Sequence, residues 1–162
     1  MRHAKSSWDD SDLADHDRPL TPRGLKAASR MAERMVHDEI APALVLCSSA
    51  RRARETLAPI QLAIGEAAKV QVEEGLYGAS SDELLQRLRR LPGSADSVMV
   101  IGHNPGIQEL AIKLVSDQRA RSQLNVKFPT AALAALRLKV GRWRDLSEGG
   151  SELITFLTPR DA

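Results

Sequence analysis

Residues 97–110, SVMVIGHNPGIQEL, decide the fold that we expect for this chain. The apolar run over residues 97–102 predicts a strand and is the clearest strand signal in the chain. Asn104 and Pro105 then have the order of a helix cap and a first-turn proline. Apolar residues recur after them at helical spacing, namely Ile107, Leu110, Ala111 and Leu114. The stretch therefore predicts a strand, a short loop and a helix.

The same order of elements occurs earlier in the chain. ALVLC at residues 43–47 is a short continuous apolar run, which predicts an inner parallel strand. Residues 50–67, ARRARETLAPIQLAIGEA, are helical in composition, and we expect Pro59 to kink or shorten this helix. A second strand, loop and helix are thus expected.

Local signals predict the remaining elements. Thr21 is a cap before a helix over residues 22–38, and Ser80 and Glu83 have capping-box spacing before a helix that ends ahead of Pro92. Three further strands are expected, at residues 69–72, 131–140 and 152–158. The last two are separated by a turn at residues 148–150, so they can pair as neighbours.

Strands that alternate with helices predict an α/β fold, a three-layer α/β/α sandwich around a mostly parallel sheet. In such folds ligands bind beyond the carboxyl ends of the strands. The chain has 162 residues, with no repeat and no linker. We therefore expect residues 1–162 to form a single domain.

Composition excludes several classes of protein. Hydrophobic residues make up 43% and charged residues 27%, the mixture of a packed protein. A net charge of +2 and only two Trp, two Phe and one Tyr argue against nucleic-acid binding. A polar start, with no apolar run of about 18 residues, argues against export and against membrane insertion. Cys47 is the single cysteine, which fits a reducing, cytoplasmic setting.

Arginines and histidines stand where an α/β fold would bind an anion. Arg2 and His3 lie at the start of the chain, His103 follows the 97–102 strand, and Arg52 lies near the start of a helix. A guanidinium matches phosphate oxygens two at a time, and a helix start adds backbone donors. A neighbouring guanidinium also disfavours the imidazolium form, which would leave His3 neutral with a lone pair for attack on phosphorus.

Nearly the whole chain resembles the histidine phosphatase superfamily, also called phosphoglycerate mutase-like, and within it the small SixA-type phosphohistidine phosphatases. SSARRARET has the spacing that places the second phosphate-binding arginine of the family at Arg52, and GHNPG carries the second active-site histidine, His103. The segments that carry the resemblance are RHAKSSW (2–8), RPLTPRG (18–24), SSARRARET (48–56), GHNPG (102–106), FPTAALA (128–134) and LITFLTPRDA (153–162).

The resemblance implies catalysis through a covalent phosphohistidine on His3. Arg2, Arg52 and His103 would hold the phosphoryl oxygens, with no metal or other cofactor. Glu74 is the nearest match to the proton donor of larger relatives. The implied substrate is phosphohistidine in a signalling, histidine phosphotransfer protein, and inorganic phosphate or sulfate could occupy the site.

Two other functions stay open from the sequence. The protein could be a small-molecule phosphomonoesterase or mutase, or a phosphate-binding module without turnover. The phosphate-binding module stays open because relatives carry an apolar strand ahead of the signature Arg-His-Ala, which is Arg2, His3 and Ala4 here. Met1 leaves no room for that strand, so we expect a truncated first strand and a His3 on a fraying terminus.

The other polar residues are interpreted more simply. The Asp-rich segment 9–19 is expected to be a solvated loop. Tyr77 is expected at the entrance of the phosphate site. Surface positions are expected for Arg51, Arg54, His16 and His37.

Overall fold

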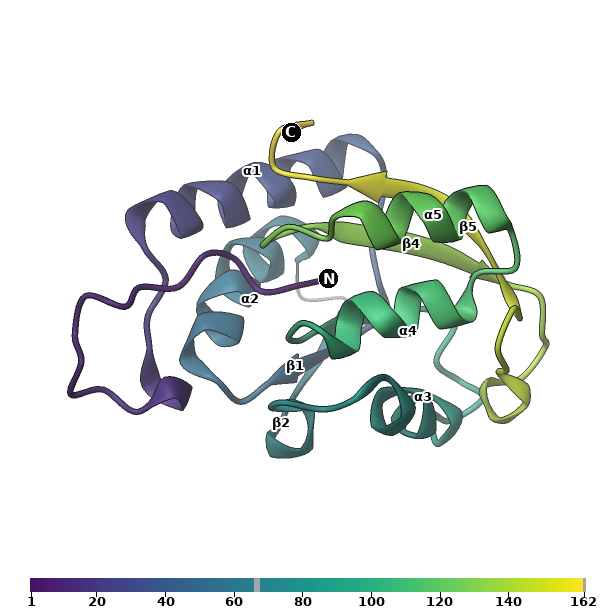
Figure 1. Ribbon diagram of the computed structural model, residues 1–162. Coiled ribbons are helices and arrows are strands. Elements are labelled where there is room, and N and C mark those ends of the chain that lie inside the picture. The colour runs from purple at the N-terminus through teal and green to yellow at the C-terminus, as the bar shows by residue number, and fades with distance from the viewer. Residues whose placement is uncertain (66–67, 162) are drawn as a thin grey trace.

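A computed structural model describes residues 1–65 and 68–161 (Figure 1). Its centre is a parallel sheet in the order β2-β1-β3, formed by β2 (Lys69–Glu73), β1 (Leu44–Ser48) and β3 (Val98–Ile101). Every residue of β1 is buried, because the strand has a neighbour on each edge and a helical layer on each face. The prediction of an inner parallel strand at residues 43–47 is confirmed.

Helices cover both faces of this sheet. Val45 and Cys47 of β1 belong to an apolar cluster with residues of the first two helices, while Leu44 and Leu46 belong to a cluster with residues of the next two (Figure 1). Successive side chains of a strand point to opposite faces, so one strand holds both layers together. The predicted α/β sandwich is confirmed. The helices are α1 (Pro22–His37), α2 (Arg51–Ile64), α3 (Ser81–Arg89), α4 (Gly106–Leu114) and α5 (Gln118–Val126).

Two of the predicted caps form as expected. The Thr21 hydroxyl oxygen accepts a hydrogen bond from the Gly24 amide at the start of α1. Ser80 and Glu83 form a reciprocal capping box at the start of α3. These bonds satisfy backbone N–H groups that a helix leaves unpaired in its first turn.

Pro59 lies inside α2, which ends at Ile64, and the expected kink or shortening at this proline stays a prediction. The last two residues of the expected helix, 66–67, lie outside the described residues. Asn104 does not cap α4, which begins at Gly106; its side-chain amide instead donates to Gln108 Oε1 at 2.9 Å.

The tail of the chain forms an antiparallel pair. β4 (Leu133–Leu138) pairs with β5 (Ser151–Leu157), with an irregular register between Ala135 and Leu136. The predicted pairing of the two tail strands is confirmed.

Residues 1–3 join the two sheets. The Met1 amine donates to the Val100 carbonyl at 2.6 Å, and the His3 amide donates to the Gly102 carbonyl at 3.0 Å. On the other side, the Arg2 amide donates to the Ala132 carbonyl at 3.0 Å. The expectation that His3 lies on a fraying terminus is therefore wrong, because backbone bonds to both sheets hold this segment.

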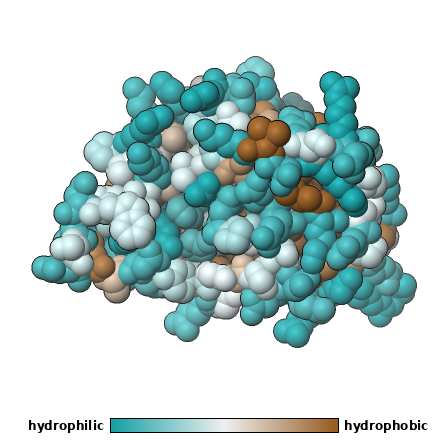
Figure 2. All heavy atoms as spheres, in the orientation of Figure 1, coloured by the Kyte–Doolittle hydropathy of each residue, from teal (hydrophilic) through white to brown (hydrophobic). Residues whose placement is uncertain are grey.

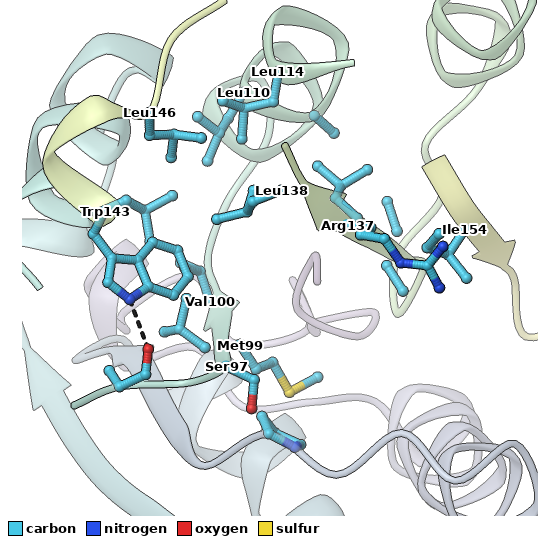
Figure 3. A pocket seen from close by; sticks show the side chains of 18 of the residues that line it. Ser97, Met99, Val100, Leu110, Leu114, Arg137, Leu138, Trp143, Leu146 and Ile154 are labelled. Atoms are coloured by element: carbon cyan, nitrogen blue, oxygen red, sulfur yellow. Dashed lines mark hydrogen bonds between the residues drawn. The ribbon is translucent and has the colours of Figure 1, made fainter. Parts of the chain in front are cut away.

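An apolar cavity of about 690 Å³ lies between β3 and β4 (Figure 3). Leu110 and Leu114 of α4 line it, and the Trp143 indole N–H donates to the Ala95 carbonyl at 2.7 Å along its wall. None of the arginine and histidine candidates lines this cavity. This cavity is therefore not where the predicted chemistry gathers.

The surface is mainly polar. The face seen in Figure 2 is largely hydrophilic, with small separate apolar areas. Within the described ranges, 1–65 and 68–161, no helix has both the length and the apolar character needed to cross a membrane.

Candidate active site

Three separate segments bring the predicted residues to one cavity. His103 follows the carboxyl end of β3, Arg52 lies in the first turn of α2 after β1, and His3 follows the residues that join the two sheets. These side chains and Arg2 line a second cavity, of about 400 Å³. The cavity lies where an α/β fold is expected to bind its ligand, beyond the strand ends.

The two imidazoles face each other. The ring centroids of His3 and His103 are 4.9 Å apart, with the ring planes inclined at 52°. Arg52 Nη2 lies 3.3 Å from His103 Nδ1, and His103 Nε2 lies 2.8 Å from the hydroxyl oxygen of Ser48. Since a guanidinium only donates, His103 Nδ1 accepts and its Nε2 carries the proton toward Ser48.

A hydrogen bond also settles the tautomer of His3. Its Nδ1 lies 2.6 Å from the Ala4 carbonyl oxygen. Because a carbonyl oxygen only accepts, Nδ1 carries the proton and Nε2 bears the lone pair. The lone pair on His3 Nε2 is therefore free, and the carbonyl of the next residue orients the ring.

Both rings are neutral at physiological pH. Burial lowers the pKa of His3 to about 3, opposed by the Ala4 bond and reinforced by the positive charges of Arg52 and Arg2. Burial likewise lowers the pKa of His103 to about 4, with Arg52 the next cause. The neutral His3 was predicted from the arginines alone, but loss of hydration is the larger effect.

Hydrogen bonds to other segments fix the Arg2 side chain and the backbone near His3 and Arg52. Arg2 Nη1 donates to the Phe128 carbonyl at 2.8 Å. The Thr56 hydroxyl, on α2, accepts a hydrogen bond from the Ala4 amide at 2.9 Å and donates one to the Arg52 carbonyl at 2.6 Å. The threonine of the SSARRARET segment thus ties the helix that carries Arg52 to the residue after His3.

The Asp-rich segment contributes a residue that sequence reasoning missed. Asp15 begins a short 3-10 helix, η1 (Asp15–Asp17), and lines the cavity. Its carboxylate accepts from Arg52 Nη2 at 2.9 Å, from the Tyr77 hydroxyl at 2.7 Å and from Arg18 Nη1 at 2.7 Å. The expectation of a solvated loop is wrong for this part. Arg18 was the sequence signal for this role, because an arginine three residues after Asp15 can form an ion pair with it.

The surface predictions had a mixed outcome. His16 is at the surface but half-buried, and its Nε2 lies 2.9 Å from the Ser49 hydroxyl oxygen. Arg51, Arg54 and His37 are exposed, as predicted. Tyr77 lines the cavity, as predicted for the entrance.

Glu74 is placed apart from the other predicted site residues. It begins the short helix η2 (Glu74–Leu76), is exposed, and is absent from the described residues that line the cavity. The neighbouring Glu73 is bound to Arg87 at 2.6 Å. Tyr77, from the same segment, is the side chain that reaches the site.

Comparison with known proteins agrees with this constellation. The sequence profile of the histidine phosphatase superfamily (branch 1) matches residues 1–80. An uncharacterised protein of Mycobacterium tuberculosis is 38% identical over 164 aligned positions, which cover 99% of this chain and 100% of that protein. The chain belongs to the histidine phosphatase superfamily.

Solved structures related to the superfamily share the whole architecture. A protein of Nakamurella multipartitia assigned as the phosphohistidine phosphatase SixA has a TM-score of 0.84 at 34% identity, over 98% of this chain and 93% of that one. The protein histidine phosphatase SixA complexed with tungstate has a TM-score of 0.80 at 23% identity, over 99% of this chain and 96% of that one, and shows the shared fold. As a SixA-like member of the histidine phosphatase superfamily, the chain is a phosphatase with the phosphoglycerate mutase-like fold.

Proposed function

We propose that this phosphatase removes the phosphoryl group from phosphohistidine in a partner protein, through a covalent phosphohistidine on His3. The observation that carries the proposal is the pair of neutral imidazoles, 4.9 Å apart, in one cavity with Arg2 and Arg52. Two guanidinium groups can neutralise a phosphoryl group, while a neutral imidazole can attack its phosphorus.

The first step transfers the phosphoryl group to the enzyme. The lone pair on His3 Nε2 attacks phosphorus, the P–N bond of the substrate breaks, and its electron pair leaves on the substrate imidazole. Arg2 and Arg52 hold the phosphoryl oxygens as charge shifts toward the leaving group, and His103 joins them by turning its Nε2–H from Ser48 to a phosphoryl oxygen. In the second step water attacks the phosphorus of phospho-His3, which releases inorganic phosphate and restores the free imidazole.

The nearby carboxyl groups are poorly suited to protonate a leaving group, which favours a phosphoramidate substrate over an alkyl phosphate. Hydrogen bonds from Tyr77, Arg18 and Arg52 hold the pKa of Asp15 well below its usual range, so this carboxylate has no proton to give at neutral pH. Glu74 does not line the cavity. A phosphorylated imidazole can take its proton before the bond breaks, so it depends less on an enzymic acid.

The rim of the cavity is compatible with a protein substrate. Trp8 lines it with 75% of its surface exposed, and Tyr77 lines it while exposed. Exposed aromatic side chains at a binding mouth are typical of protein recognition. Two solved structures that match at TM-scores of 0.84 and 0.83 are assigned as the phosphohistidine phosphatase SixA, which supports the same class of substrate. A cytoplasmic location belongs to this proposal.

Trapping of the phosphoenzyme tests the proposal. The protein is mixed with a histidine phosphotransfer domain that carries radiolabelled phosphohistidine, in EDTA, and is quenched at short times. We expect label on the wild-type protein, release of phosphate, and loss of both in His3→Ala. His37→Ala, which alters an exposed histidine, serves as the control.

Parallel assays with sugar phosphates separate the alternatives. Turnover of sugar phosphates without turnover of phosphohistidine would identify a small-molecule phosphomonoesterase. Binding of phosphate with turnover of neither substrate would identify a phosphate-binding module. Label that persists in His3→Ala would exclude His3 as the nucleophile.

A further inference from the structure

Arg52 is held at both of its terminal nitrogens by one residue. Arg52 Nη1 donates to the main-chain carbonyl of Asp15, and Arg52 Nη2 donates to the carboxylate of Asp15 at 2.9 Å. The Arg52 side chain is 7% exposed. A guanidinium held by two such bonds keeps one orientation, because turning it would break both.

Asp15 is itself anchored to the segment that follows His3. Its second carboxylate oxygen accepts from Arg18 Nη1 at 2.7 Å. Arg18 is buried and also donates to the Ser6 hydroxyl oxygen and to the Ser7 carbonyl, each at 2.7 Å. The chain of bonds runs from residues 6 and 7, through Arg18 and Asp15, to Arg52.

The Asp15 carboxylate also positions the aromatic ring of Tyr77, which lines the cavity. The Tyr77 hydroxyl donates to Asp15 at 2.7 Å. The Tyr77 ring then lies edge-on to His103, with centroids 5.5 Å apart, and the guanidinium carbon of Arg52 lies 5.7 Å from the ring centroid. One carboxylate thus contacts two groups that line the cavity and that both lie next to His103.

We propose that Asp15 is a positioning residue for phosphoryl binding, which fixes Arg52 beside His103 through its carboxylate and its main-chain carbonyl. The inference rests on the proposed function in one respect, namely that Arg52 holds the phosphoryl oxygens. Two of the five N–H groups of Arg52 are left for a phosphoryl group, because Asp15 engages one on each terminal nitrogen and His103 Nδ1 accepts the other on Nη2.

The opposite effect is the main competing interpretation. A carboxylate next to Arg52 could compete with the phosphoryl group for the guanidinium, in which case removing its charge would tighten phosphate binding. Positioning predicts the reverse, because an unfixed guanidinium must be ordered when the ligand binds. The sign of the change in affinity therefore decides between the two.

Binding of inorganic phosphate and turnover of a phosphorylated histidine phosphotransfer domain test the proposal. We expect Asp15→Asn, which keeps one acceptor oxygen, to weaken phosphate binding and kcat/KM by about fivefold to tenfold, and Asp15→Ala by more than about thirtyfold. Asp12→Asn removes the same charge from an exposed position of the same segment and should stay within about twofold of wild type.

Pairing with an Arg52 variant separates positioning from a general structural role. In an Arg52→Ala background, we expect Asp15→Ala to add less than about a twofold further loss, because the residue it positions is gone. The pH profile of Asp15→Asn should keep the shape of the wild-type profile, since Asp15 donates no proton to the leaving group.

The outcomes that overturn the proposal are distinct from failure of the proposed function. Tighter phosphate binding in Asp15→Asn, or an undiminished effect of Asp15→Ala in the Arg52→Ala background, would refute positioning. A third outcome separates the two proposals. If phosphate binds wild type, binds the Asp15 variants more weakly as described, and phosphohistidine is not turned over, the proposed function is wrong and the positioning role stands.

Discussion

At the scale of single residues, the two imidazoles of the candidate site are kept neutral, and this lowers the stability of the protein in acid. Folding lowers the pKa of His3 from 6.5 to about 3 and that of His103 from 6.5 to about 4, with burial as the largest cause of each. Below about pH 6.5 the unfolded chain protonates these rings and the folded protein does not. Their contribution to stability is therefore complete above that pH and is lost as the pH falls toward the folded-state values.

This pH dependence can be measured by urea unfolding between pH 7 and 4.5. We expect His3→Ala to remove up to about 1.4 kcal/mol per pH unit from the acid slope of the unfolding free energy. His37→Ala, which removes an exposed ring whose Nδ1 lies 2.8 Å from the Asp38 carboxylate, should change that slope much less than His3→Ala. Equal slopes for His3→Ala and wild type would mean that the His3 ring takes up its proton in the folded state.

At the scale of elements, the start of α4 depends on a glycine that touches another segment. A Cβ added at Gly106 would lie 2.0 Å from the Ala79 carbonyl oxygen, which no side-chain rotation can relieve. Gly75, in the segment that leads to Tyr77, has open space around the same added atom. Close approach by α4 keeps the turn after His103 against the segment that carries Tyr77.

We therefore expect Gly106→Ala to destabilise the protein by about 1–3 kcal/mol, through overpacking against backbone. It should also raise KM for a phosphorylated substrate, because the turn at His103 must move. Gly75→Ala should change the unfolding free energy by less than about 0.5 kcal/mol. Thermal or urea unfolding of the two variants gives the comparison, and equal stabilities would contradict the close contact.

At the scale of the whole molecule, β1 joins both apolar clusters into one cooperative unit. Val45 packs on the α1 and α2 side and Leu46 on the α3 and α4 side, and neither side chain is exposed to solvent. Losing either cluster therefore removes the support of the other. Small domains with such a shared core unfold in one step.

Two variants test this cooperativity. We expect Leu46→Ala to cost about 2–5 kcal/mol and Val45→Ala somewhat less, each in a single transition. The transitions followed by far-ultraviolet circular dichroism and by Trp143 fluorescence in a Trp8→Phe background should coincide. A circular dichroism change that precedes the Trp143 change in Val45→Ala would show two independent halves.

Much of the fold could be predicted because its signals are local. The apolar runs at residues 43–47 and 97–102, the Thr21 cap and the Ser80 capping box each lie within a few neighbouring residues, and each forms as expected. The Asn104 cap was wrong because its side chain donates to Gln108 instead of the start of α4. The fate of His3 also lay beyond local reasoning, since its backbone bonds come from residues 99 and 128 positions away.

By itself, the amino-acid sequence determined that strands alternate with helices, and it pointed to the two arginines and two histidines that share the cavity. Parallel strands bring their carboxyl ends to one edge, so residues placed after them converge without any further information. Only the tertiary structure decided that Asp15 reaches Arg52, that Glu74 stays outside the cavity, and which ring nitrogen of His3 is free. Those outcomes depend on hydrogen bonds and burial between segments that become neighbours only when the chain folds, and a side chain's charge and orientation follow from its neighbours in space.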